Sequence, residues 1–172
     1  MDVPATTLEG LESPRAGRTS VWLRRGFLAL VLAVALAGGS GLLGAYTSTA
    51  TATGGGYTLT LSYPRVARAG LDTVWEVRVA HPGGFDKPVT LAVTSSYFDV
   101  FETQGFHPDA SKSTDDGRFL YLTFDPPPGD TLVVDFDAYV QPASQTGRSA
   151  TIAVVDGTTS LVSLDYSTRL VP

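Results

Sequence analysis

Two histidines, His81 and His107, are the residues of this chain best suited to acid–base or metal chemistry. A histidine serves as a general base where a serine and an aspartate are arranged around it. His81 follows a predicted strand and precedes a Pro-Gly-Gly turn, whereas His107 stands before Pro108 in a polar segment. The sequence has no Gly-x-Ser-x-Gly turn to present a nucleophile, and neither histidine has further ligands at zinc-site spacing. We therefore predict two exposed loop histidines, no catalytic residues and no enzymatic activity.

Two pairs of charged residues are placed so that each pair projects from one face of a predicted strand. Asp135 and Asp137 are two residues apart, and so are Glu76 and Arg78 on the strand that contains Trp75. If these strands are neighbours, Arg78 can bridge to an aspartate across the sheet. Because such a pair stabilises a solvated sheet face by at most about 1 kcal/mol, the pattern favours a structural role over catalysis.

A calcium site is the alternative for the aspartates of the polar segment 105–117, which is predicted to be a long loop. Asp109, Asp115 and Asp116 offer the carboxylate oxygens that calcium prefers. Their spacing lacks the D-x-D-x-D-G pattern of a calcium-binding loop. Cysteine is absent from the chain, which removes disulfides, thiol catalysis, cysteine metal ligands and a lipoprotein anchor. We expect neither a metal nor a cofactor.

An aromatic cluster beside this polar segment is the closest approach to a binding surface. It consists of Tyr97, Phe98, Phe101 and Phe106. Core packing is the interpretation we favour, because aromatic residues are usually buried. The alternative is an interaction surface, in which one or two of the four side chains are exposed and anchor a partner at the end of the domain.

Strands must position these residues, because the hydrophobic pattern from residue 57 onward has a period of two. Tyr57–Tyr63 alternates apolar and hydroxyl residues, and the segments around Trp75 and over 132–140 alternate apolar and charged ones. Turns rich in proline and glycine separate seven or eight short strands. The predicted fold class is all-β, an antiparallel β-sandwich over 57–172 with Trp75 in its core, preceded by one N-terminal transmembrane helix.

A family resemblance accompanies this pattern. The strand of Trp75 is followed by a Pro-Pro-Gly-Asp turn at 127–130, and Gly147-Arg148 precedes the segment ATIAVVDG at 150–157. This order resembles the Ig-like repeat modules of bacterial surface proteins, of the cell-adhesion-related and conserved-repeat type, over about 57–171. The whole layout is similar to small single-pass membrane proteins of actinobacteria. The resemblance implies an Ig-like sandwich and no catalytic residues; because the Ig cysteine pair is missing, Trp75 fills the core unaided.

A membrane anchor is predicted over residues 21–46, because 26–46 carries no charge and about 20 apolar residues span a bilayer. The residues before it predict a disordered cytoplasmic tail at 1–20, and TSTATATGGG at 47–56 predicts a flexible linker. Four arginines precede the apolar run and none follows it until Arg65, so the C-terminal domain should be extracytoplasmic. These four are Arg15, Arg18, Arg24 and Arg25.

Two alternatives for this segment remain open. A signal peptide with its apolar core at 27–37 would be cleaved after Ala37, since Ala35-Leu36-Ala37 has the A-x-A form. Arg24-Arg25 also partly matches a twin-arginine export signal. We favour the retained anchor because the apolar run continues to spanning length. Small residues repeat every four positions along it and suit helix–helix packing; they are Ala29, Ala33, Ala37, Gly41 and Ala45.

The charge balance narrows the class of partner. The domain after residue 57 is acidic, and the chain carries a net charge of −5. An acidic surface disfavours nucleic acid and anionic lipid. We expect a non-enzymatic accessory or interaction protein in the cell membrane, contacting the bilayer through 21–46 and a membrane or cell-envelope protein through its domain. The alternative is an envelope ligand-binding or sensor domain for a sugar or peptide.

Overall fold

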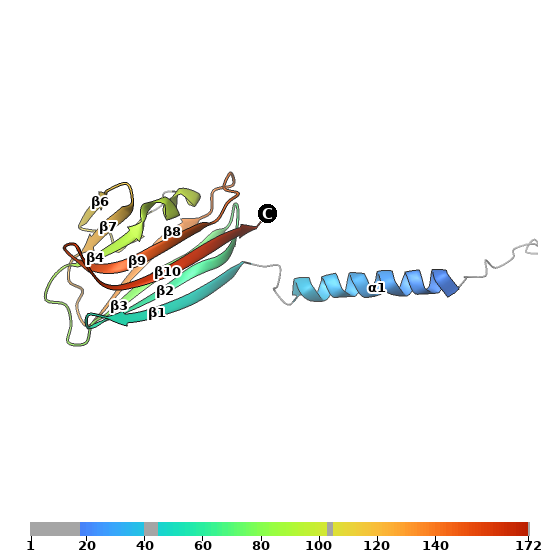
Figure 1. Cartoon of the computed structure of the whole chain (residues 1–172), viewed down its shortest axis with the longest axis horizontal. Coiled ribbons are helices and arrows are strands. Elements are labelled where there is room, and N and C mark those ends of the chain that lie inside the picture. The colour runs from blue at the N-terminus through green and yellow to red at the C-terminus, as the bar shows by residue number, and fades with distance from the viewer. Residues whose placement is uncertain (1–17, 40–44, 103–104, 172) are drawn as a thin grey trace, which may run out of the picture. The chain divides into compact units, whose positions relative to one another are not determined.

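The fold is all-β with one N-terminal helix, as the sequence predicts (Figure 1). The structure, a computed structural model, describes residues 18–39, 45–102 and 105–171. The chain divides into two compact units, residues 1–43 and residues 44–172. Each unit is described by itself below.

The helix α1 spans Arg18–Gly39 and has 22 residues. Alanine, leucine and valine fill it after Arg25, and no proline interrupts it. At 1.5 Å per residue its length is about 33 Å, close to the roughly 30 Å of a bilayer's hydrocarbon core, although Arg24 and Arg25 lie within its N-terminal part. Residues 19–39 meet the length and composition of a membrane span, and they are not buried by the rest of the protein. The helix begins at Arg18, so the predicted disordered tail was wrong for 18–20; residues 1–17 lie outside the described residues.

The predicted flexible linker at 47–56 is instead a β-hairpin. Strand β1, Tyr46–Gly54, pairs antiparallel along its whole length with β2, Tyr57–Arg68. Gly55 and Gly56 between them have φ values of 56° and 83°, the positive values that a tight two-residue hairpin turn requires. The alternation of threonine with alanine is itself a strand pattern, and β-branched threonine favours strands. Because Tyr46 starts β1, the predicted end of the spanning helix at residue 46 was also wrong.

The ten strands form one connected path that divides into two sheets sharing β10 (Figure 1). The first sheet has the order β5-β8-β3-β2, with β1 on the far side of β2. The second has the order β10-β9-β4-β7-β6. Apart from the 3₁₀ helix η1, Ser95–Val100, the remaining elements are the strands β3 Asp72–Ala80, β4 Val89–Thr94, β5 Phe106–His107, β6 Lys112–Asp115, β7 Phe119–Phe124, β8 Thr131–Tyr139, β9 Arg148–Asp156 and β10 Thr159–Val171.

The strand count and one pairing differ from the prediction. There are ten strands rather than seven or eight, because β1 replaces the linker and the short strands β5 and β6 lie in the predicted loop 105–117. One pairing is parallel: Arg169–Val171 of β10 runs beside Val66–Arg68 of β2. All other pairings among the named strands are antiparallel. The finer assignment as an Ig-like sandwich remains a prediction.

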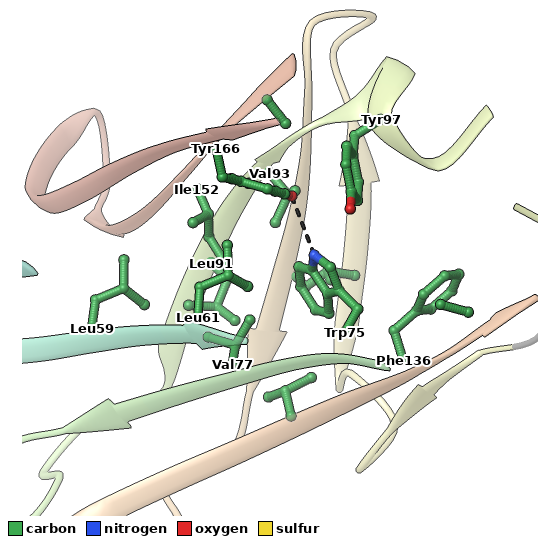
Figure 2. Packing of buried hydrophobic residues seen from close by; sticks show 14 of the residues in the cluster. Leu59, Leu61, Trp75, Val77, Leu91, Val93, Tyr97, Phe136, Ile152 and Tyr166 are labelled. Carbon is green, nitrogen blue, oxygen red and sulfur yellow. Dashed lines mark hydrogen bonds between the residues drawn. The ribbon is translucent and has the colours of Figure 1, made fainter. Parts of the chain in front are cut away.

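One hydrophobic cluster collects the inward-facing residues of both sheets. In β8 the buried positions alternate strictly with Asp135 and Asp137, as the sequence pattern predicts. Trp75 in β3 is only 1% exposed and lies within the cluster, near Tyr97 and Phe136 (Figure 2). The two-residue period therefore decides which side chains form the core and which remain on the outer face of the sheet.

Candidate functional site

The aromatic cluster at 97–106 packs into the core, and the alternative of an interaction surface stays a prediction for its two partly buried members, Phe98 and Phe106. Tyr97 is 0% and Phe101 2% exposed. Phe98 and Phe106 are partly buried and pack against the same cluster. The ring centroids of Phe98 and Phe106 lie 5.7 and 6.1 Å from that of Trp75, in edge-on geometry. Each aromatic ring removes a large apolar area from water, which draws these residues inward despite the polar segment beside them.

Two buried hydroxyl groups join β3 and η1 to β10. The indole Nε1–H of Trp75 donates to Oη of Tyr166 over 3.3 Å (Figure 2). Oη of Tyr97 lies 2.9 Å from Oγ1 of Thr168, and both atoms are buried. Burial raises the pKa of Tyr97 and that of Tyr166 well above the ordinary phenol value. Both phenols therefore stay neutral at physiological pH and serve as hydrogen-bonding groups of the core.

A polar row crosses the outer face of the first sheet and is the candidate site. The strand register aligns one residue from each of five strands: Thr49, Ser62, Glu76, Asp135 and His107. The strands of Trp75 and Asp135 are neighbours, since β3 pairs with β8. His107 is exposed as predicted, but it lies in β5 and not in a loop.

Arg78 does not bridge to an aspartate. Its Nε donates to Oε1 of Glu76 on its own strand over 2.7 Å, and the residue opposite Arg78 on β8 is Val133. Glu76 instead faces Asp135. The register therefore brings two carboxylates together and places the arginine beside one of them.

Burial and the negative charge of Glu76 raise the pKa of Asp135. A hydrogen bond between the two carboxyl groups acts in the same direction, because it requires one of them to hold a proton. The positive charges of Arg78 and His107 act in the opposite direction. The outer face thus holds a carboxyl group that takes up a proton more readily than an ordinary aspartate.

Replacing Asp135 with asparagine should therefore raise the melting temperature at neutral pH and leave it unchanged below pH 3.8, the ordinary aspartate pKa. A pKa that is higher in the folded than in the unfolded chain means that ionisation opposes folding. The loss of stability caused by ionisation of Asp135 is absent below pH 3.8 and develops as the pH rises through the raised pKa of the folded protein. Thermal melts at both pH values test it, with Asp137→Asn as the control, because Asp137 faces Val74. An equal change at both pH values would contradict the prediction.

An open hollow of about 730 Å³ adjoins this row. Its lining includes Asp72, Val74, His107, Asp135 and Asp137, with Trp75 among the other residues. Val74 is 54% exposed, which is unusual for an apolar side chain of this domain. Three aspartates around an exposed valine form an acidic surface with an apolar centre. Such a surface suits a cationic side chain with an apolar stem, presented by a protein or peptide.

Asp115 and Asp116, two of the three aspartates predicted as a calcium alternative, hold the turn between β6 and β7, whereas Asp109 lies before β6. Asp116 accepts the backbone N–H groups of Arg118 and Phe119 over 2.8 and 2.7 Å. These bonds, that of Phe119 foremost, lower its pKa. Asp115 accepts the N–H of Gly117 over 2.6 Å and the hydroxyl of Ser95. Within the described residues, no group of three or more potential metal ligands comes together; the expectation of no metal stays a prediction.

His81 packs against two aromatic rings, those of Tyr57 and Phe85. Its Nδ1 donates to the carbonyl of Gly84 over 2.7 Å. Its ring centroid lies 4.5 Å from that of Tyr57 and 5.8 Å from that of Phe85. The side chain is half-buried, so the prediction of an exposed histidine was wrong here. The bond to Gly84 and the ring contacts give His81 a structural role.

The small-residue repeat of the apolar segment is shorter than predicted. Ala29, Ala33 and Ala37 lie one turn apart on α1. Ala45 precedes β1 and is not helical, whereas Gly41 lies outside the described residues. Among the described residues, three members of the repeat are therefore helical.

No family model matches the chain, and no curated protein matches its sequence. The sequence interpretation missed the row from Thr49 to His107, because β1 and β5 were not predicted as strands. The alternation of threonine over 47–53 was the signal that could have revealed β1.

Proposed function

We propose that the protein is a membrane-anchored, Ig-like accessory protein that is not an enzyme and that works by contact with a membrane or cell-envelope protein. The observation that carries this proposal is the acidic outer face of the first sheet with Val74 exposed at its centre. Exposed apolar groups rimmed by charge are typical of protein-contact surfaces.

The anchor is supported by α1, a helix of spanning length whose apolar side chains are exposed. Arg24 and Arg25 lie at its N-terminal side, so the N-terminus is cytoplasmic and the β domain extracytoplasmic by the positive-inside rule. The β domain follows this helix in the same chain, so the anchor tethers it to the membrane. The domain therefore meets extracytoplasmic parts of other membrane proteins at high effective concentration.

The Ig-like assignment is supported by the strand pairings. β3 pairs with β8, whereas β4 pairs with β9 and β7 in the other sheet. With β2, β3 and β8 taken as Ig strands A, B and E, and β4, β9 and β10 as C, F and G, the pairings of β3 with β2 and β8 and of β9 with β4 and β10 agree with the Ig arrangement. Trp75 is central to the core, but its place departs from the Ig pattern, because β3 is strand B in this assignment and the buried tryptophan of Ig domains lies on strand C.

A cross-linking experiment on intact cells tests location and contact together. The chain's two lysines, Lys87 and Lys112, lie in the β domain and are exposed. Lys87 pairs with Asp156 over 3.0 Å, yet its side chain is 74% exposed. We expect a membrane-impermeant amine cross-linker to join these lysines to a membrane or envelope protein, which mass spectrometry then identifies.

The double variant Lys87→Arg/Lys112→Arg is the matched control, because it keeps both charges and removes both reactive amines; it should give no product. Products formed only after cell lysis would contradict the orientation. If the natural protein gives no cross-linked product in intact cells or after lysis, the proposed contact function is wrong. The hollow beside Asp135 then favours the alternative, an envelope ligand-binding domain for a cationic peptide, since its three aspartates supply the complementary charge.

A further inference from the structure

Strand β1 has one edge that pairs with β2 and another that pairs with no strand among the described residues. Figure 1 shows β1 at the rim of its sheet. The strand has nine residues, so its open edge is about 30 Å long. The strands at the two ends of the strand path are much shorter: β5 has two residues and β6 has four, with Lys112 and Asp115 at its ends. β10 pairs only with β9 over residues 159–168, but that stretch contains the charged Asp165. An open edge of this length exposes unpaired backbone N–H and C=O groups.

The open edge of β1 lacks the features that usually prevent an edge strand from pairing with a strand of another chain. Natural edge strands are commonly short, charged, interrupted by proline or bent by a bulge. Tyr46–Gly54 contains neither a charged residue nor a proline. The one register irregularity falls between Tyr46 and Thr47, at the very start. From Thr47 to Gly54 the strand is regular and is open to a further strand.

The sequence of β1 is nearly symmetric about its midpoint, Ala50. Thr49 corresponds to Thr51, Thr47 to Thr53, and Ser48 to Ala52. We propose that β1 pairs antiparallel with β1 of a second copy of this chain, in a register centred on Ala50. This register aligns the whole strand of each copy. It places threonine opposite threonine on the outer face and small residues opposite small residues on the inner one.

The existing hairpin shows how the outer face of such a pair is held. In the pairing of β1 with β2, Oγ1 of Thr51 lies 3.1 Å from Oγ1 of Thr60, and Oγ1 of Thr49 lies 3.3 Å from Oγ of Ser62. Each hydroxyl has two acceptor sites and one donor. Thr49 and Thr51 can therefore bond to the second copy without giving up these contacts.

Charge also favours this edge for self-association. The chain carries a net charge of −5, so two copies repel each other over most of their surface. β1 is uncharged, and so is the segment Tyr57–Pro64 of β2 behind it. Antiparallel pairing is two-fold symmetric and uses both open edges, so it yields a closed dimer and not a growing chain.

This inference is independent of the proposed function, because a dimer through β1 leaves the outer face around Val74 and Asp135 uncovered. A failure to find a cross-linked partner rejects the contact function and leaves the β1 dimer standing. A failure to find the dimer rejects the β1 pairing and leaves the contact function standing.

The first test is the mass of the full-length protein in mild detergent, measured by light scattering after size exclusion. We expect a dimer for the natural sequence and a monomer for Thr49→Lys/Thr51→Lys, because the register places these lysines opposite each other. Ser163→Lys/Ser167→Lys on β10 is the control, with the same charge change at two exposed positions four residues apart on one strand; it should stay dimeric. Circular dichroism confirms that each variant is folded.

The second test uses the absence of cysteine from the natural chain. In the proposed register Ala50 faces its own copy, and opposite residues of antiparallel strands lie about 4.5–5.5 Å apart at Cα, within disulfide range. Ala50→Cys should therefore form a disulfide-linked dimer under mild oxidation in membranes, whereas Ser163→Cys should not.

Three results would overturn the proposal: a monomeric natural protein, a dimer that survives Thr49→Lys/Thr51→Lys, or Ala50→Cys joined to a different protein. The variant Ala29→Leu/Ala33→Leu separates a dimer held by α1 from one held by β1. If it dissociates the dimer and the lysine pair on β1 does not, the helix and not the strand makes the contact.

Discussion

Replacing Trp75 with alanine is expected to lower the free energy of unfolding by about 3–5 kcal/mol, the range for large aromatic residues removed from a core. The side chain is almost wholly buried and meets three phenylalanine rings edge-on. Those rings come from η1, β5 and β8, so they cannot all close the cavity without moving three elements. Urea unfolding followed by far-ultraviolet circular dichroism measures the loss.

Two smaller substitutions separate the effect of the Trp75 side-chain volume from that of its hydrogen bond to Tyr166. Trp75→Phe keeps an aromatic ring but removes the indole N–H, so we expect a smaller loss than with alanine. Tyr166→Phe keeps the ring of Tyr166 and leaves the Trp75 N–H without its acceptor, which costs about 1–3 kcal/mol in a buried site. If Trp75→Ala costs less than about 1 kcal/mol, Trp75 is not the centre of the core.

The strands with regular apolar–polar alternation could be predicted from the sequence, because burial of one sheet face requires that pattern. β3 and β8 are the clearest cases: Trp75 and Phe136 face inward, whereas Asp135 and Asp137 face outward. β1 was misjudged because its inward residues are small. Alanine and glycine bury little apolar area, so Thr47–Gly54 resembles a tether in composition while having the period of a strand.

The short strands and the candidate site could not be predicted, because both depend on register between distant segments. His107 reaches the sheet only through the pairing of β5 with Asp135 of β8. Glu76 and Asp135 are 59 positions apart (135 − 76 = 59) and face each other because β3 and β8 pair in one particular register. Each strand's sequence identifies its outward residues, but it does not specify which residues of the neighbouring strand lie opposite them.

Replacing Gly147 with alanine is expected to destabilise the domain by about 1–3 kcal/mol or more, as overpacked sites do. A Cβ atom at this position would lie 2.0 Å from the carbonyl oxygen of Thr168 and 2.9 Å from Cα of Arg169. Both are backbone atoms of β10, so no side-chain rotation relieves the contact. The start of β9 would have to move away from Thr168, whose hydroxyl contacts Tyr97.

The sign of this change makes the experiment decisive. Gly147 does not have a positive φ, and at such positions glycine-to-alanine substitution ordinarily stabilises a protein by about 0.4–1 kcal/mol, because it restricts the unfolded chain. A stabilised Gly147→Ala variant would therefore show that β9 and β10 are not in this close contact. Ser149→Ala, two residues after Gly147 and exposed in β9, is the control and should change stability by less than about 0.5 kcal/mol. Hydrogen exchange at 166–171 should quicken in the glycine variant alone, since that segment carries the displaced backbone and its parallel pairing with β2.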